Sequence, residues 1–457
     1  MKKTFFFITL IFCASYVFFA CKKKDTSGNG TVIASISGLN CTATTFSNVA
    51  SINVAYAATA SVPYTGGNAG AYAAGTSIAS TGVTGLTATL IAGTLSSSSG
   101  YLSYNITGTP SAVGNAIFEI NFGTQTCTFT LPVAATATAS NCDALTGVAK
   151  LICLSNAFKS TLSSSQIATA QLAYTFSNIK TWSNLPAALS ARIGIKLGNL
   201  SATQLTAAKA VIKQMSGTAA NEGWQEIEQL WGADDYLAVN GGGATYGAGN
   251  YYLAFFGTPA STGTFEIMMT GHHKTVANTY KDGVLIAATP HFAATEPLSF
   301  TSGGVTYSPI TQEKDAFVNV LAGLSSTQLT AAKSSATFSD LLLGPNANWS
   351  FPTTSAGLQC NTLSTAQKTL VLNAIKTYVN DIDDENAAII NALYASEIDN
   401  TFILYSGTTA MNTRNDYFRI DGPHVWIEFS VQNGIILSGV HYHSVWRDRI
   451  NDYGTTR

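Results

Sequence analysis

The sequence predicts a multidomain protein in which a small all-β sandwich is followed by a larger α+β domain. Three observations lead to this fold class. Residues 31–135 contain short segments of alternating apolar and polar residues, separated by Gly- and Ser-rich turns. Residues 142–457 contain helical patterns that interleave with strand-like segments without a regular βαβ rhythm. The chain of 457 residues is also long enough for two or three domains.

The N-terminus is typical of a secretory signal peptide. Two lysines precede an apolar run that ends at Ala20 and is shorter than the ~20 apolar residues that a membrane span needs. Ala20 followed by Cys21 resembles a lipobox, so we expect removal of residues 1–20 and attachment of lipid at Cys21. Residues 21–30 are polar and contain glycine, which predicts a flexible tether. The alternative is a retained N-terminal helix.

These features predict a protein exported from the cytoplasm. The lipid would anchor it to the outer membrane, in either the periplasmic or the cell-surface leaflet, and the membrane would be its partner through that lipid. Charged residues make up 11% of the chain, against about 25% in typical soluble proteins. The net charge of -2 gives no reason to expect nucleic acid as a partner. A substrate would be a small molecule or an envelope polymer.

Five cysteines follow the lipidation site, and disulfides are permitted outside the cytoplasm. Cys41 and Cys127 lie near the two ends of the first domain and are predicted to pair. Cys142 and Cys153 cannot pair if one continuous helix holds both, because ~1.5 Å per residue separates them too far. With Cys360 the count is odd, so the pairing of the last three cysteines is left open.

The first domain is predicted to be a spacer. Its segments 101–106 and 116–122 alternate in polarity, which favours a small antiparallel sandwich. The stretch from Gly85 to Cys127 resembles the Ser/Thr/Gly-rich modules that are common in Bacteroidetes surface proteins, and this resemblance implies a spacer role.

A phrase of the form Leu-Ser-x-x-Gln occurs four times in the second domain. Each copy couples a serine to a run of helix formers, which fits an N-cap that opens a helix. The unequal spacing of the copies argues against a solenoid, so the phrase predicts helix starts and no chemistry. The copies begin at Leu162, Leu200, Leu324 and Leu363.

All six histidines follow residue 270, which directs attention to the C-terminal part of the chain. Residues 423–446 read as a β-hairpin around Asn433-Gly434, a strong signal for a two-residue turn. In this register Trp426 pairs with His441. Since paired residues share a face of the sheet, the polar face would collect five side chains: His424, Trp426, Glu428, His441 and His443.

Histidines two positions apart on a strand point to the same side, which suits a common metal. We therefore expect His441 and His443 as ligands, with a third from His272, His273 or His424. Since adjacent side chains on extended backbone point in opposite directions, only one of His272 and His273 is expected to enter the site. Imidazole with carboxylate favours zinc, iron, manganese or copper. The alternatives without metal are a polar, hydrogen-bonded surface and an acid/base pair.

Two further side chains of this face are candidate catalytic residues. Glu428 would be a general base toward a metal-bound water, whose pKa such a site lowers. Arg447 would hold an anionic or carbonyl group of the substrate, or alternatively pair with Asp448. His291 is predicted to be structural. Glu296 would be a ligand, a base or a solvated loop carboxylate.

Four motifs of the second domain recur together in one family. They are Gly271-His272-His273, Thr289 to Phe292 with Glu296-Pro297, Arg419 to Phe429, and His441 to Asp448. They resemble the family named domain of unknown function 3500, and the resemblance covers about residue 142 to the C-terminus. Lys274 departs from the family pattern, which tends to have an apolar residue there. The resemblance implies that the histidine motifs form one recurrent set, and it implies no activity.

The sequence contains no G-x-S-x-G elbow, P-loop or H-E-x-x-H motif, which disfavours the usual serine hydrolases, NTPases and zincin proteases. We therefore expect a metal-dependent hydrolase of the cell envelope or exterior. A lipoprotein that binds metal or another ligand without turnover is the alternative. A third interpretation is a structural surface protein whose histidines only form hydrogen bonds.

Overall fold

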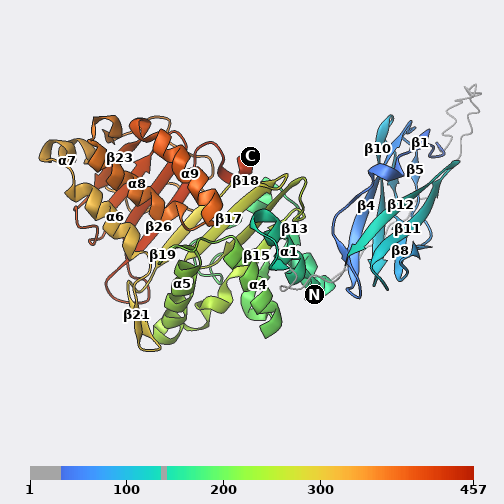
Figure 1. The fold of residues 1–457 in the computed structure, drawn as a ribbon, viewed down its shortest axis with the longest axis horizontal. Coiled ribbons are helices and arrows are strands. Elements are labelled where there is room, and N and C mark those ends of the chain that lie inside the picture. Colours follow the sequence, from blue (N-terminus) through green and yellow to red (C-terminus); the bar gives the residue numbers. More distant parts are fainter. Residues whose placement is uncertain (1–31, 135–141, 457) are drawn as a thin grey trace, which may run out of the picture.

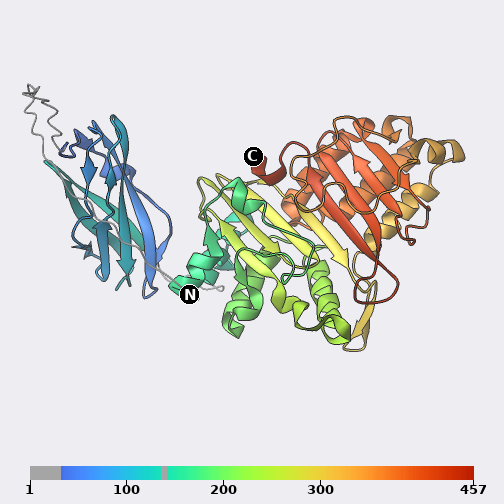
Figure 2. The same cartoon turned by 180° about the vertical axis from the view of Figure 1, so that it is seen from behind.

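The computed structural model describes residues 32–134 and 142–456, which form a β-sandwich and a larger α+β domain (Figures 1 and 2). This confirms the predicted fold class. The predicted signal peptide, the lipidation site Cys21 and the tether lie outside the described residues. Within the described ranges, no helix has the length and apolar character that a membrane crossing requires.

The sandwich contains two sheets whose inner faces pack together, and their strands pair antiparallel except for the short strand Ala50–Ser51, which runs parallel to its neighbour. Its strands are β1 (Gly38–Leu39), β2 (Thr45–Phe46), β3 (Ala50–Ser51), β4 (Tyr56–Thr65), β5 (Ala71–Tyr72), β6 (Ile78–Ala79), β7 (Thr81–Gly82), β8 (Leu86–Leu90), β9 (Gly93–Thr94), β10 (Ser99–Gly108), β11 (Gly114–Phe122) and β12 (Gln125–Ala134). One sheet has the order β1-β4-β10-β8-β6 and the other β3-β12-β11-β7. Exposed and buried residues alternate along β11 from Asn115 to Phe122, as the sequence pattern requires. Cys41 and Cys127 form the predicted disulfide.

The second domain is built on one large sheet. Its helices are α1 (Gly147–Ser160), α2 (Ser164–Ala170), α3 (Phe176–Ile179), α4 (Ala202–Gln214), α5 (Gly223–Leu237), α6 (Thr311–Ala322), α7 (Ser326–Ala332), α8 (Thr365–Val379) and α9 (Asp384–Ser396). Its main strands are β13 (Gln171–Leu172), β14 (Ile195–Lys196), β15 (Tyr252–Phe256), β16 (Thr264–Thr270), β17 (Lys274–Lys281), β18 (Val284–Ala287), β19 (His291–Thr295), β22 (Leu358–Gln359), β23 (Phe402–Ser406), β24 (Tyr417–Asp421), β25 (Val425–Asn433) and β26 (Val440–Asp448). A small hairpin, β20 (Phe300–Ser302) and β21 (Val305–Tyr307), precedes α6.

The large sheet consists of two halves with the same plan. Its order is β13-β15-β16-β17-β19-β26-β25-β24-β23-β22, so β19-β17-β16-β15 on one side correspond to β26-β25-β24-β23 on the other. The halves meet where β19 pairs with β26 in antiparallel register, with His291 opposite Trp446. Each half places its main helices before its strands along the chain, as the colours of Figure 1 show.

The four Leu-Ser-x-x-Gln copies confirm the predicted helix starts and reveal this duplication. Each serine caps a helix through a capping box with the glutamine three residues later. Gln166 hydrogen-bonds Gln204 in the first half, and Gln328 hydrogen-bonds Gln367 in the second. The copies therefore work in pairs, and their spacing is unequal because each pair recurs once per half.

Helices cover one face of the sheet, and loops cover the other. Leu253 and Phe255 of β15 pack with α1, α4 and α5 in one core cluster. Ala254 and Phe256 of the same strand pack in a separate cluster with Trp182 and with residues near the C-terminus. We call these the helical face and the loop face. The alternation along the strands therefore separates two chemical environments within one domain.

The structure corrects one expectation about the cysteines. Cys142 and Cys153 form a disulfide, so the premise that one continuous helix holds both is wrong. Helix α1 begins only at Gly147, where a positive φ of 53° lets the preceding segment turn back toward the helix. Cys360 is free and buried.

The sandwich disulfide should contribute more stability than its counterpart before α1, because it closes a longer loop. Cys41 and Cys127 are separated by 86 residues and Cys142 and Cys153 by 11. Replacing both Cys41 and Cys127 by alanine should lower the free energy of unfolding of the sandwich by about 4 kcal/mol, against about 3 kcal/mol for the shorter loop. Urea unfolding measures both. Dithiothreitol should not lower the stability of the sandwich further in the Cys41→Ala/Cys127→Ala variant. An unfolding free energy of the sandwich equal to that of the wild type would contradict the expectation.

Candidate metal centre

The hairpin that carries His441 and His443 has a different register from the predicted one. Asn433 pairs with Val440, so a loop of residues 434–439 replaces the two-residue turn and the register is shifted by six residues. The physical reason is the buried carboxylate of Glu296, whose Oε1 accepts the N–H groups of three consecutive loop residues, Ile435, Ile436 and Leu437. Glu296 therefore shapes the loop. The predicted register is wrong, but the shift is even, so the predicted faces remain.

His441 and His443 lie on the loop face with their rings close together. The two Nε2 atoms are 3.0 Å apart, and Nδ1 of His443 is 2.9 Å from Oδ1 of Asp340. The carboxylate accepts a hydrogen bond from Nδ1–H, which keeps the ring proton on Nδ1 and leaves the lone pair on Nε2 of His443. Nε2 of His443 then faces Nε2 of His441, an arrangement that either one shared hydrogen or one cation satisfies.

His272 and His273 both belong to this centre, which corrects the expectation that only one would. They lie in the turn between β16 and β17, outside the strands, so their side chains do not alternate. Their ring centroids stack at 3.4 Å, and Nδ1 of His272 is 2.7 Å from Oδ1 of Asp234 near the end of α5. Asp234, His272 and His273 each offer one ligand atom within 4.8 Å of the others.

The two groups of histidines lie next to each other across the junction of the halves. The ring of His273 is 6.2 Å from that of His441 and 6.4 Å from that of His443, between centroids. All of these rings are buried. Burial and the neighbouring histidines lower the pKa of His273 well below its ordinary value, and they lower that of His441 to about 3. Both imidazoles are therefore neutral at pH 7, the form that binds metal.

His424 lies away from this centre, contrary to the predicted gathering of three histidines. In the observed register His424 directly precedes β25 and lies near Asp448, the last residue of β26. His443 pairs instead with Ser430, six residues further along the chain. Its Nδ1 is 2.6 Å from Oε1 of Glu397. This pair is the counterpart, in the second half, of the Asp234–His272 pair.

The two predicted catalytic residues are both held by protein groups. Glu428 is fully buried and accepts hydrogen bonds from the backbone of Leu342 and Leu343, from Trp426 Nε1 and from Tyr417 Oη. Its geometry is that of an anchor for the segment after Asp340, and it leaves no free oxygen for a base.

Arg447 is likewise enclosed. Its guanidinium pairs with the buried carboxylate of Asp452 at 2.5 Å and donates to the carbonyl of Leu343. The expected alternative partner, Asp448, instead accepts the backbone N–H groups of Ile450 and Asn451.

An open pocket borders the histidines on the loop face. It has a volume of about 240 Å³ and is lined by Phe292, Asp340 and residues 341, 342 and 344–347, among others. The ring of Phe292 lies 5.8 Å from that of His443, and the Asp340 side chain is 45% exposed. A small molecule in this pocket would meet the Asp340 carboxylate before it meets the histidines.

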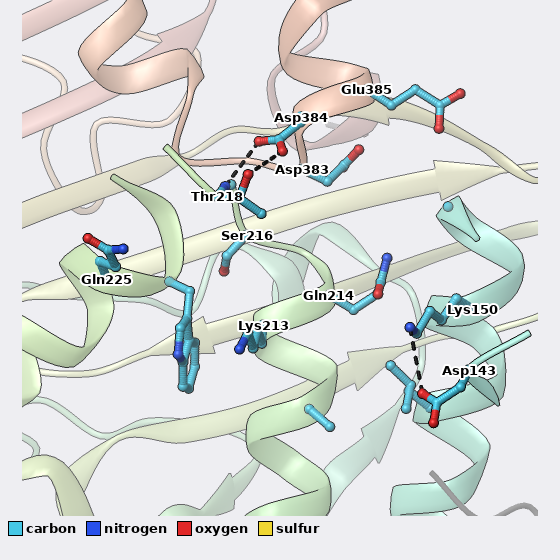
Figure 3. A pocket seen from close by; sticks show the side chains of 15 residues that line it. Asp143, Lys150, Lys213, Gln214, Ser216, Thr218, Gln225, Asp383, Asp384 and Glu385 are labelled. Atoms are coloured by element: carbon cyan, nitrogen blue, oxygen red, sulfur yellow. Dashed lines mark hydrogen bonds and ion pairs between the residues drawn. The ribbon is translucent and has the colours of Figure 1, made fainter. Parts of the chain in front are cut away.

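A larger pocket lies elsewhere, on the side of α4, α5 and the start of α9 (Figure 3). It has a volume of about 800 Å³, and its wall includes a tight contact in which Thr218 donates to Asp384. Lys150 and Lys213 also line it, and Lys150 pairs with Asp143. No histidine lines this pocket, so pocket volume alone would not have identified the histidine centre.

His291 lies on the helical face, and its surroundings agree with the predicted structural role. Its Nε2 is 2.9 Å from Oδ2 of Asp381, which also binds Nζ of Lys274 at 2.6 Å. Burial and the Lys274 charge lower the pKa of His291 to about 4. Lys274, the departure from the family pattern, is thus the cation of a buried carboxylate group.

Neither Asp340 nor Asp234 was among the site residues predicted from the sequence. Asp234 lies 38 residues before His272 and Asp340 lies 103 residues before His443. No spacing rule relates such positions. The local signal for Asp234 was a carboxylate near the end of a helix, where anions are disfavoured by the helix dipole and need a partner.

Fold and site together define a two-domain protein whose larger domain is internally duplicated and carries a buried histidine–carboxylate centre at the junction of its halves. The family described as "Protein of unknown function (DUF3500)" matches residues 145–455. The chain belongs to this family. No curated protein and no solved structure shows significant similarity to it.

Replacing Glu428 by glutamine should distinguish a structural role of this carboxylate from a role as general base. The amide would present an NH₂ group to N–H and O–H donors, so we expect the free energy of unfolding to fall by about 2 kcal/mol. Binding of metal should be unchanged, since Glu428 does not contact the histidines. Chemical unfolding and metal analysis measure the two properties. An unchanged stability would contradict the anchoring role.

The neutral state of His291 predicts a pH dependence of stability. Its pKa is about 4 in the fold and about 6.5 in an unfolded chain, so the unfolded state binds the proton first. The contribution of neutral His291 is complete above pH 6.5 and is lost as pH falls toward 4, by roughly 3 kcal/mol. Unfolding of the wild type and of His291→Gln at pH 7 and pH 4 tests this. Equal losses in both proteins would refute it.

Proposed function

We propose that this protein is an exported, lipid-anchored, metal-dependent hydrolase that acts in the cell envelope or exterior. The observation that carries the proposal is the pair of Nε2 atoms of His441 and His443, 3.0 Å apart, with Asp340 at Nδ1 of His443. A carboxylate behind a histidine is the usual second shell of a catalytic metal. Its substrate would be a small molecule or an envelope polymer.

The donors fit a transition metal better than a hard cation. His272, His273, His441 and His443 offer imidazole nitrogens, and Asp234 adds a carboxylate. This set suits zinc, iron, manganese or copper. A metal held there would supply a Lewis acid. Burial supports the proposal because it lowers the pKa values of His273 and His441, which keeps these two rings neutral and able to bind metal.

Asp340 would take the role first assigned to Glu428. Its carboxylate is part exposed, lines the pocket of about 240 Å³ and contacts His443. It would fix the tautomer of His443 and accept a proton from a nucleophile in the pocket. Phe292 and residues 341, 342 and 344–347 form the pocket wall and would exclude water from the nucleophile on the side away from Asp340.

Export and lipid anchoring remain proposals from the N-terminal sequence. The two disulfides support export because such bonds persist in oxidising compartments.

A non-catalytic metal-binding lipoprotein is the second candidate, and one observation favours it. Asp234, His272 and His273 converge as one group of three ligand atoms, and His441 and His443 lie beside that group. A metal bound by four or more of them would have little room for substrate.

The first test is the metal content of residues 22–457, purified without a His tag and supplied with zinc, iron, manganese and copper. We expect close to one metal ion per chain by mass spectrometry in the wild type. The double variant His441→Ala/His443→Ala should lose it. His424→Ala is the matched control and should keep it, because His424 pairs with Glu397 outside the centre.

The outcomes separate the candidates. A wild type without metal would exclude both metal-based functions. If metal is present, Asp340→Asn distinguishes the enzyme from the binding protein. At saturating metal, an enzyme should lose hydrolysis of p-nitrophenyl esters or phosphates in this variant by 10²-fold or more, on the order expected for a lost general base. A binding protein should show no hydrolysis in either form.

A further inference from the structure

A second group of ionisable side chains lies on the helical face, separate from the histidines. Glu222 at the start of α5, Glu226 within α5 and Glu313 within α6 each place one carboxylate oxygen within 4.8 Å of the others. Their exposed fractions are 7%, 0% and 1%. Helix α5 belongs to the first half of the domain and α6 to the second, so this carboxylate cluster bridges the halves.

The cations of the protein do not balance this cluster. Lys274 Nζ contacts Glu226 Oε1 at 2.5 Å and Asp381 Oδ2 at 2.6 Å. Among the described residues, the ammonium of Lys274 is therefore the one cation set against four buried carboxylates: those of Glu222, Glu226, Glu313 and Asp381. His291 adds no charge at pH 7, because its pKa is about 4. Unbalanced buried carboxylates cost several kcal/mol each unless they take up protons or bind a cation.

The arrangement of the oxygens favours a bound cation. After the contacts of Lys274 are counted, Oε2 of Glu222, Oε2 of Glu226 and Oε2 of Glu313 have no hydrogen-bond partner within residues 32–134 and 142–456. Buried carboxylate oxygens without partners are rare in proteins and call for an explanation. Here three of them belong to side chains that already converge on one point.

We propose that Glu222, Glu226 and Glu313 bind one hard divalent cation, of the class of Mg²⁺, Mn²⁺ or Ca²⁺, at a site distinct from the histidine centre. Oxygen-only ligands select this class over zinc or copper. The cation offsets two of the surplus negative charges and joins α5 to α6, which fixes the two halves to each other on the helical face. Without it, the cluster keeps protons.

The N-terminal turn of α5 offers an entry path. Gln225, in the same turn as Glu222, lines the large pocket of Figure 3, and Glu222 is the most exposed member of the cluster. Gln225 also lines a smaller pocket beside Phe300. Two pockets therefore border the turn that follows Glu222, while Glu226 and Glu313 are more deeply buried.

The test uses Mn²⁺ alone as the probe, followed by electron paramagnetic resonance, on chelator-treated residues 22–457 that carry His441→Ala/His443→Ala. This background removes His441 and His443 but keeps Asp234, His272 and His273. The effect of Glu313→Gln, which leaves those three residues unchanged, therefore assigns the bound Mn²⁺ to the carboxylate cluster. We expect one saturable Mn²⁺ per chain, competed by Mg²⁺ or Ca²⁺, and a higher melting temperature on binding.

Glu313→Gln in this background should weaken Mn²⁺ binding by about tenfold or more. Glu266→Gln is the matched control: Glu266 is also fully buried in the same domain, but it bonds Thr279 and is not in the cluster. It should bind Mn²⁺ like the parent. If Glu313→Gln does not fold, Glu222→Gln at the edge of the cluster gives the same reading. Absence of saturable binding, or equal affinity in all variants, would overturn the proposal and leave a proton-sharing cluster.

Discussion

The antiparallel pairing of β19 with β26 is the interaction on which the second domain depends. It joins two halves of equal plan into one continuous sheet, with His291 opposite Trp446 at the junction. Without it, each half would expose the edge of a long central strand. Both proposed metal sites lie near this junction. The histidine centre lies on the loop face and the carboxylate cluster on the helical face.

The alternation of side chains along the central strands explains why two such different centres coexist. His443 on β26 points to the loop face, while Lys274 on β17 and His291 on β19 point to the helical face. One face gathers buried imidazoles, and burial and mutual proximity lower the pKa values of two of them, His273 and His441. The other gathers carboxylates around one ammonium. The sheet keeps the two electrostatic environments apart.

Much of this architecture depends on local signals and could be predicted. The strands of the sandwich follow from alternation, and the four helix starts follow from Ser and Gln in capping boxes. The faces of β25 and β26 were predictable as well, since an even shift preserves them. The register was not, because Glu296, 139 residues before Ile435, holds the connecting loop. The same limit hid Asp340, whose distance along the chain from His443 exceeds the range of any sequence pattern.

The histidine centre takes Asp234, His272 and His273 from one half of the domain and Asp340, His441 and His443 from the other. In a protein built from two separate copies, such a centre would exist only while the copies were associated, and it would disappear on dilution. Here both halves belong to one chain, so the assembly of the centre does not depend on concentration. Because the halves are parts of one chain, their sequences can also differ. The second half keeps a single carboxylate–histidine pair at the position equivalent to Asp234–His272, namely Glu397 with His424, while the histidine centre forms at the junction.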